Sequence, residues 1–145
     1  MLNFFNEDVD FSHDSLLHIS AWAHHVASLE SYILHEVNYI FCSDAYLLNV
    51  NREYLDHDFY TDIITFDNSD QEGFLEADIF ISIERVTDNA QLHQTTFFEE
   101  LLRVMIHGIL HLLGFDDHDE YSKAEMRSME DKYINLYYRE FHEKS

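Results

Sequence analysis

The segment from Leu101 to Leu113 constrains the fold of this chain most, because it is apolar over nearly its whole length. Thr96 and Glu99 precede it in the Thr-x-x-Glu pattern of a helix-capping box. Gly114 follows it as a residue suited to a left-handed helix end. Since a helix that is apolar nearly all round belongs in the interior of a domain, we expect the core to form around this one.

His107 and His111 are the two histidines of this helix, and their spacing of four residues places both imidazoles on one helix face. Each imidazole needs a polar partner if it is buried. One divalent cation would satisfy both rings at the roughly 2.0 to 2.1 Å of a zinc–nitrogen bond. We therefore predict that the two residues bind one metal ion, zinc or another divalent metal.

A third metal ligand is expected just beyond Gly114, where Asp116, Asp117 and His118 follow one another. Three protein ligands would leave one coordination position open for water, as in catalytic rather than structural zinc sites. Structural sites commonly use several thiolates, whereas this chain has a single cysteine, Cys42, which we interpret as a core residue. These features predict a metal-dependent hydrolase.

The remaining segments alternate between strand and helix patterns. Strands are predicted at 3–9, 37–42, 61–66 and 74–83, and further helices at 15–29, 45–54, 84–92 and 122–141. This order predicts an α+β, zincin-like fold, in which helices cover a mixed sheet of about four strands and the central buried helix carries the histidines. A length of 145 residues with 46% hydrophobic content fits a single hydrolase domain over residues 1–145.

The charge of the chain disfavours nonspecific binding to nucleic acids. Its 29 acidic and 8 basic residues give a formal net charge of −21, which repels phosphate backbones and anionic membranes. A bound cation and a few local arginines can still reverse the potential within one cleft. The N-terminus lacks the basic and apolar regions of a signal peptide, and no apolar run approaches about 18 residues. We expect a cytoplasmic protein without a membrane partner.

The string from His107 to His118, His-Gly-Ile-Leu-His-Leu-Leu-Gly-Phe-Asp-Asp-His, closely resembles a family signature. The signature is His-Gly-x-Leu-His-Leu-x-Gly-Tyr-Asp-His of the YbeY family of bacterial metal-dependent endoribonucleases. Segments 60–66 and 77–82 are similar to that family's Pro-Thr-Asp-Val-Leu-Ser-Phe and Gly-Asp-Ile strands.

The resemblance implies an α/β or α+β domain with one zinc ion bound by three side chains. It further implies a single-strand-specific endoribonuclease involved in ribosomal RNA maturation and ribosome quality control. The implied partners are single-stranded ribosomal RNA and the ribosome or ribosome-associated proteins, and no DNA is expected.

The family pattern leaves the third ligand open. The family places its third histidine six residues after the second, and here that position holds Asp117, one residue before His118. The spacing favours Asp117, which is a competent zinc ligand, whereas the residue type favours His118. If Asp117 binds, its charge partly neutralises the ion and weakens its Lewis acidity relative to three neutral imidazoles.

Candidate cations and proton acceptors surround the motif. Leu55 stands where the family carries an arginine before its Thr-Asp strand, so Arg52 and Arg103 are the candidate phosphate partners of the catalytic site. Candidate general bases, chosen by their proximity to the motif or to the flanking strand, are Asp116, His118 and His57.

Two rival functions follow from the same features. Zinc metallopeptidases share the two-histidine helix, but their His-Glu-x-x-His pattern carries a catalytic glutamate where this chain has Gly108. A metallopeptidase-like hydrolase built on this chain would lack that proton acceptor. The other rival is a non-catalytic, zinc-binding, ribosome-associated factor, in which a fourth protein ligand would close the coordination of the ion.

Overall fold

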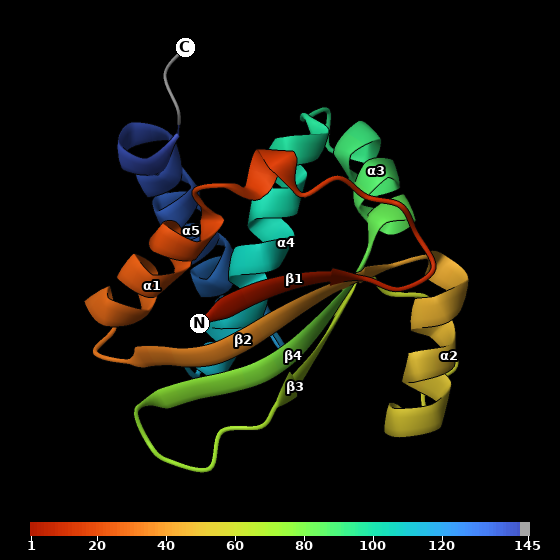
Figure 1. Cartoon of the computed structure of the whole chain (residues 1–145), viewed down its shortest axis with the longest axis horizontal. Coiled ribbons are helices and arrows are strands. Elements are labelled where there is room, and N and C mark those ends of the chain that lie inside the picture. Colours follow the sequence, from red (N-terminus) through yellow and green to blue (C-terminus); the bar gives the residue numbers. More distant parts are fainter. Residues whose placement is uncertain (143–145) are drawn as a thin grey trace.

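The computed structural model describes residues 1–142, which form a four-stranded sheet flanked by helices (Figure 1). The strands are β1 (Leu2–Asn6), β2 (Ile33–Cys42), β3 (Ile63–Asp67) and β4 (Phe74–Ser82). The helices are α1 (Ile19–Leu29), α2 (Asp44–Leu55), α3 (Ile83–Leu92), α4 (Phe97–Leu112) and α5 (Glu120–Leu136), with short helical turns at Asp14–Leu16 and Tyr137–Phe141. None of the helices described is both long and apolar enough to cross a membrane.

The sheet has the strand order β1-β2-β4-β3. The pairs β1–β2 and β2–β4 are parallel, whereas β3 and β4 are antiparallel neighbours in the chain and in the sheet. This last pair is the hairpin that the sequence predicts. The predicted α+β fold with a mixed sheet of four strands covered by helices is confirmed.

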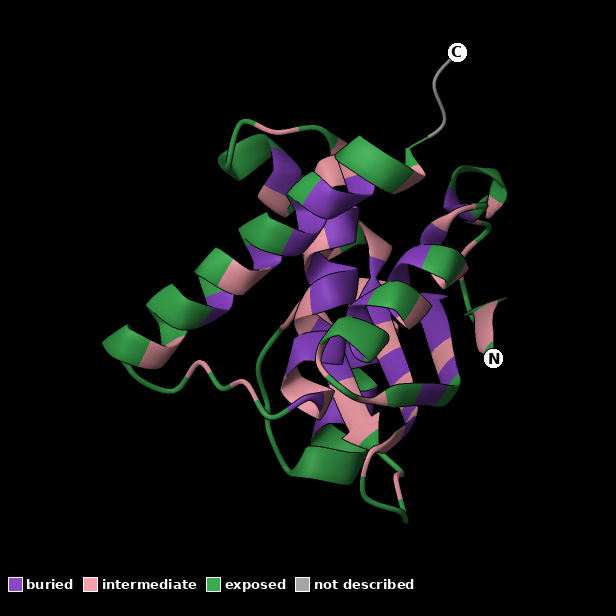
Figure 2. Ribbon diagram, turned by 90° about the vertical axis from the view of Figure 1, so that its left-hand side faces the viewer, coloured by how far each residue is buried: buried purple, intermediate pink, exposed green. Residues whose placement is uncertain are grey.

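The two faces of the sheet support cores of different size. Side chains alternate along a strand, so Ala77, Ile79 and Ile81 of β4 enter the main core, which also takes residues from α1, α4 and α5. Phe80, between them, packs on the opposite face, in a smaller core under α2. Figure 2 shows buried residues along the inward sides of the helices and exposed residues on their outward sides.

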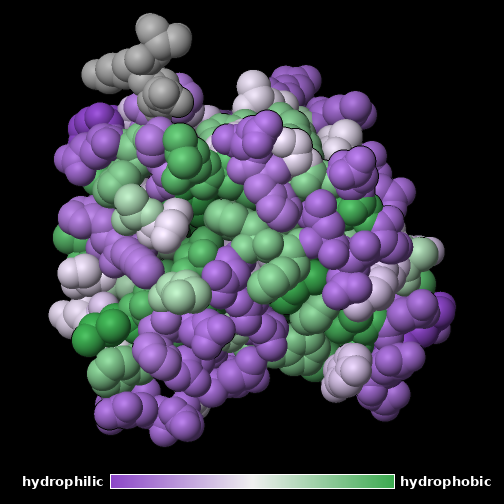
Figure 3. Space-filling view, in the orientation of Figure 1, coloured by the Kyte–Doolittle hydropathy of each residue, from purple (hydrophilic) through white to green (hydrophobic). Residues whose placement is uncertain are grey.

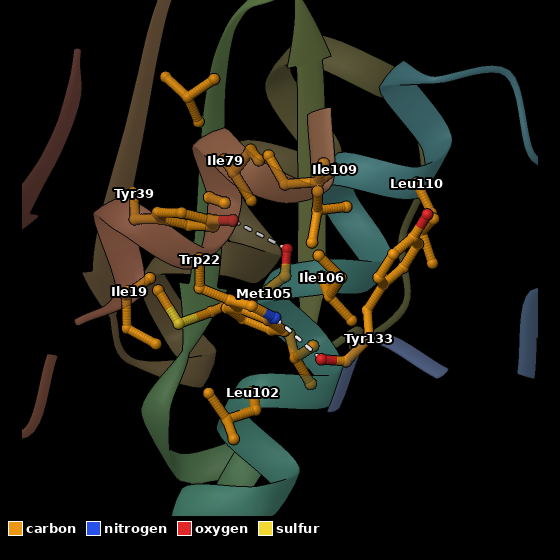
Figure 4. Close-up of a cluster of buried hydrophobic side chains, with 14 of the residues drawn as sticks. Ile19, Trp22, Tyr39, Ile79, Leu102, Met105, Ile106, Ile109, Leu110 and Tyr133 are labelled. Carbon is orange, nitrogen blue, oxygen red and sulfur yellow. Dashed lines mark hydrogen bonds between the residues drawn. The ribbon is translucent and has the colours of Figure 1, made fainter. Parts of the chain in front are cut away.

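Helix α4 is central to the main core, as the sequence predicts, and two hydrogen bonds tie the surrounding aromatic residues in place (Figure 4). The hydroxyl of Tyr39 donates to the backbone oxygen of Met105 at 2.8 Å. The indole Nε1 of Trp22 donates to the backbone oxygen of Tyr133, also at 2.8 Å. These large side chains can therefore be buried without leaving their polar atoms unpaired.

Capping residues fix both ends of α4. The Thr96 hydroxyl accepts a hydrogen bond from the backbone N–H of Glu99 at 3.1 Å, which confirms the cap of the predicted capping box. The Glu99 carboxylate accepts from the Thr95 hydroxyl, so the reciprocal half of the box is replaced by this contact. At the other end, Gly114 adopts a φ of +103°, which residues with a side chain rarely reach. The chain can therefore turn back over the end of the helix, where the third ligand is expected.

Two helices differ from their predicted spans. The expected helix 15–29 is a short turn followed by α1 from Ile19. The expected helix from residue 122 begins earlier, because Asp119 and Ser122 form a reciprocal capping box: Asp119 accepts from the Ser122 N–H at 2.7 Å, and the Ser122 hydroxyl accepts from the Asp119 N–H at 3.1 Å. This α-helix ends at Leu136 and continues as a π-helical turn.

Gly108 allows α4 to lie close to the sheet. A Cβ atom at this position would lie 3.1 Å from the Cδ1 atoms of both Ile63 and Ile79, and 3.3 Å from the hydroxyl of Thr65. These three residues belong to β3 and β4. Helix packing therefore accounts for the glycine in the motif, and it brings the flanking histidines close to β3.

Cys42 is a core residue, as interpreted from the sequence. It is fully buried in the smaller core under α2. Burial, together with the charges of Asp8, Glu7 and Asp44, raises the pKa of its thiol to about 12. Since the thiolate is the reactive form, Cys42 is unsuited to act as a nucleophile.

Candidate metal centre

His107, His111 and Asp117 line one cavity of about 640 Å³. Its wall also takes residues from β3 and from the segment between α2 and β3. The two histidines come from adjacent turns of α4, and Asp117 comes from the loop beyond Gly114. The close approach of α4 to β3 thus determines where this cavity lies.

The three side chains are close enough to bind one metal ion. The Nε2 atoms of His107 and His111 lie 3.0 Å apart. One carboxylate oxygen of Asp117 lies 3.5 Å from His107 Nε2, and the other lies 3.7 Å from His111 Nε2. One ligand atom from each of the three residues lies within 4.8 Å of the other two.

These separations suit a tetrahedral ion. Metal–ligand bonds of about 2.0 to 2.2 Å at tetrahedral angles place neighbouring ligand atoms roughly 3.3 to 3.6 Å apart. The separation of 3.0 Å between the two Nε2 atoms is slightly below that range, and the 3.5 Å between His107 Nε2 and one Asp117 oxygen falls within it. The 3.7 Å from His111 Nε2 to the other Asp117 oxygen is slightly above it. Two imidazole nitrogens and one carboxylate oxygen also form a donor set that catalytic zinc sites use, with room for a fourth ligand.

Glu130 of α5 fixes the orientation of the His107 ring. One of its carboxylate oxygens lies 2.7 Å from His107 Nδ1, on the side of the ring opposite the metal-binding nitrogen. Its other oxygen accepts a hydrogen bond from Arg103 at 3.0 Å, and Arg103 also donates to Asp131 at 2.7 Å. A carboxylate behind a ligand imidazole holds the ring and its tautomer in place in metal sites.

The pKa values of the two histidines shift in opposite directions. Burial opposes the charged form of His107, but hydrogen bonding to Glu130 and the charges of Glu130, Asp117 and Asp62 outweigh it and raise its pKa. Burial lowers the pKa of His111, and the neighbouring His107 lowers it further. The contrast follows from Glu130, whose carboxylate favours a positive charge on His107, and from the repulsion that this charge exerts on a second positive charge at His111.

His118 lies away from the other candidate ligands. Its side chain is 68% exposed, with Nδ1 at 2.7 Å from Asp116 and Nε2 at 3.3 Å from Asp119. It does not belong to the group of metal-binding atoms found among residues 1–142. Of the two alternatives for the third ligand, the geometry favours Asp117.

The candidate catalytic residues Arg52, Arg103 and Asp116 all lie outside the wall of the large cavity. Arg52 pairs with Asp58 on the surface, and neither Arg52 nor Asp116 is among the residues that line the large cavity. Arg103 lines a smaller cavity of about 250 Å³ that shares His107 and Asp117 with the large one, and its guanidinium is engaged by Glu130 and Asp131. The catalytic roles of these three residues stay predictions.

Three residues of the site escaped the sequence reasoning. Glu130 falls on the apolar stripe of α5, in line with Met126 and Tyr133, and a carboxylate at such a position is a signal that could have revealed it. Asp62 lines both cavities, and burial raises the pKa of its carboxyl. Phe59 also lines the large cavity. Asp62 lies in segment 60–66, and the similarity of that segment to the family's Thr-Asp strand is the signal that could have revealed it. No sequence pattern marks Phe59, whose place depends on the course of the loop before β3.

Similarity to known proteins extends along almost the whole chain. The family model described as endoribonuclease YbeY matches residues 4–138. A relative of that name from Cytophaga hutchinsonii is 52% identical over 133 residues, which cover 92% of this chain and 93% of the relative. Another, from Amoebophilus asiaticus, is 44% identical over 131 residues, covering 90% and 89%. The solution structure of a Thermotoga maritima protein is 28% identical with a TM-score of 0.69, covering 97% of this chain and 91% of that one.

If Asp117 rather than His118 is the third ligand, the two alanine variants should differ in how much Zn²⁺ stabilises them against unfolding. Free Zn²⁺ at 100 times its Kd should stabilise the wild-type protein by about 2.7 kcal/mol, or roughly 5–10 °C in Tm for a chain of this size. Asp117→Ala should lose most of this shift, and the matched variant His118→Ala should keep it, as measured by thermal unfolding with and without Zn²⁺. The reverse pattern would assign the third ligand to His118.

The contact between Glu130 and His107 predicts an effect on metal affinity. Glu130→Gln removes the charge that orients the imidazole, so the Kd for Zn²⁺ should rise by about 10- to 100-fold in calorimetric titration. Asp131→Asn is the matched control, because Asp131 contacts Arg103 but is not a partner of His107. An unchanged Kd in Glu130→Gln would show that this carboxylate does not support the ligand.

Proposed function

The chain belongs to the family of YbeY endoribonucleases, and from this premise we propose that it is a zinc-dependent endoribonuclease specific for single-stranded RNA. The resemblance identified in the sequence is confirmed by the family model and by the relatives. As a member of this family the chain is an RNA-cleaving hydrolase.

The grouping of His107, His111 and Asp117 in an open cavity carries the proposal. We assign these three residues as ligands of one zinc ion, with other divalent metals as substitutes. When bound there, such an ion supplies Lewis acidity, which polarises a phosphoryl oxygen and lowers the pKa of a coordinated water molecule. The cavity has room on the open side of the three ligands for a segment of substrate.

The protein's own residues hold this centre and receive the proton. Glu130 fixes His107, so that Nε2 of that ring stays directed at its partner ligands. Of the proton acceptors proposed from the sequence, His57 lines the cavity, whereas Asp116 and His118 pair with each other and do not line it. We therefore favour His57 among these three as the residue that accepts a proton during hydrolysis.

The peptidase alternative is weakened by Gly108. In a metallopeptidase of the His-Glu-x-x-His type, the carboxylate at this position is the general base. Here the position faces Ile63, Ile79 and Thr65 at distances that leave a side chain little space. The alternative of a purely structural ion is weakened by the donor group itself, which contains three ligands among residues 1–142 rather than the four that close structural sites.

We further propose that the substrate is ribosomal RNA and that the protein acts in its maturation and in ribosome quality control in the cytoplasm. Partners in this role would be the ribosome or ribosome-associated proteins. Family membership supports this assignment. The strongly acidic composition is consistent with a protein that binds RNA at one specific site, because its negative surface repels the RNA backbone elsewhere.

Cleavage assays test the proposed activity. Zinc-loaded protein should cleave single-stranded ribosomal RNA, leave matched duplex RNA and casein intact, and lose activity with a chelator. His111→Ala should lower the rate of RNA cleavage by at least about 100-fold, the order expected when electrostatic stabilisation of the reaction is lost. His118→Ala, prepared in parallel, should remain active. Cleavage that persists in His111→Ala would reject the assigned site, and cleavage of casein would favour the peptidase.

A further inference from the structure

An aromatic pair forms part of the wall of the large cavity. His57 and Phe59 line it together with His107 and His111. Their rings are stacked, with centroids 5.1 Å apart and an angle of 23° between the planes. Phe59 is 55% exposed. Because single exposed apolar residues are common on protein surfaces, the informative feature is the place of this ring beside the candidate metal ligands.

The backbone that carries the aromatic pair is anchored although the rings are not packed in the core. The side-chain amide of buried Asn51 donates to the backbone oxygen of Phe59 at 2.9 Å. The backbone N–H of His57 donates to the backbone oxygen of Asn51 at 3.1 Å. Both ends of the pair are thus tied to α2. A ring presented from a fixed backbone loses less conformational freedom when a ligand binds.

The side chains around the cavity do not supply the usual contacts that hold RNA. Asp62, Asp67 and Asp117 line it, and the described residues contribute neither Lys nor Arg to its wall. The protein as a whole carries a net charge of −21. On the face shown in Figure 3, hydrophilic residues are spread widely, with apolar patches between them. Contacts of Lys and Arg with phosphates dominate most protein–nucleic acid affinities, so this wall needs another source of binding energy.

Base stacking supplies such a source. Unpaired RNA bases stack on aromatic side chains in many proteins that bind single strands. Bases carry no net charge, so an acidic wall does not repel them as it repels phosphates. The cavity volume of about 640 Å³ also falls within the roughly 300–1,000 Å³ of pockets that enclose small organic groups.

We propose that Phe59, backed by the ring of His57, stacks on an unpaired base of the RNA and holds the substrate beside the metal ligands. The inference rests on the proposed endoribonuclease function and specifies how its substrate is bound. It explains a preference for single strands, because the bases of a duplex are stacked on one another and unavailable to Phe59. It also requires binding to depend only weakly on salt, since few phosphates are neutralised by side chains.

Steady-state kinetics on a single-stranded RNA test the role of Phe59. Phe59→Ala should raise KM by about 5- to 150-fold, the range of measured losses for one stacked base, with a much smaller change in kcat. Phe59→Trp should restore the KM. The matched control is Tyr54→Ala, since Tyr54 is an exposed aromatic residue that lines a separate groove with Phe66. A KM that is the same in Phe59→Ala and the wild type overturns the proposal and leaves the cleavage function intact.

Binding to the metal-free Phe59→Trp variant tests stacking without cleavage. A single-stranded oligonucleotide should quench the new tryptophan fluorescence, because Trp22 is buried and insensitive, and an abasic oligomer of equal length should bind far more weakly. The slope of log Kd against log salt concentration should stay below about 1.4, the value for two neutralised phosphates. Equal binding of the abasic oligomer, or a steep salt dependence, overturns the proposal. Quenching without any cleavage by the metal-loaded wild type would support stacking and reject the proposed function.

Discussion

The close packing of α4 against β3 and β4 is the constraint on which the rest of the structure depends. At Gly108 the helix backbone approaches the sheet so closely that a Cβ atom would lie 3.1 Å from two isoleucine side chains. The neighbouring histidines are thereby held next to β3 and at the wall of the cavity. Helix α5 also packs on α4, and its Glu130 contacts Nδ1 of the His107 ring, opposite the nitrogen that faces the other ligands. Fold and candidate metal centre are therefore parts of one arrangement.

Sequence patterns predicted the elements that depend on local chemistry. The apolar run, its Thr96 cap and its glycine end defined α4 almost to the residue. The spacing of His107 and His111 predicted two imidazoles on one helix face, and their Nε2 atoms lie 3.0 Å apart. The start of α5 was misplaced because a capping box at Asp119 lies ahead of the apolar pattern. Family spacing favoured Asp117 over His118, and the structure puts the Asp117 carboxylate within 4 Å of both histidines.

Long-range contacts account for what the sequence could not predict. Glu130 supports His107 only because α5 packs along α4, and the chain separation between the two residues conceals this contact. Phe59 and Asp62 reach the cavity through the course of the loop before β3, which no periodicity describes. Arg103 illustrates the converse: its position one turn before His107 suggested a phosphate partner, yet its guanidinium is held by carboxylates of α5. A charged residue near a motif is therefore weak evidence for a role at the reacting atoms.

The central claim is that two imidazoles and one carboxylate hold a single ion in an open site. A crystal structure of the zinc-loaded protein, with anomalous scattering measured at the zinc edge, tests it most directly. The account predicts one ion bonded to His107 Nε2, His111 Nε2 and a carboxylate oxygen of Asp117 at about 2.0 to 2.2 Å, with no fourth protein ligand. An ion bound by His118, closed by a fourth protein side chain, or placed away from α4 would contradict it.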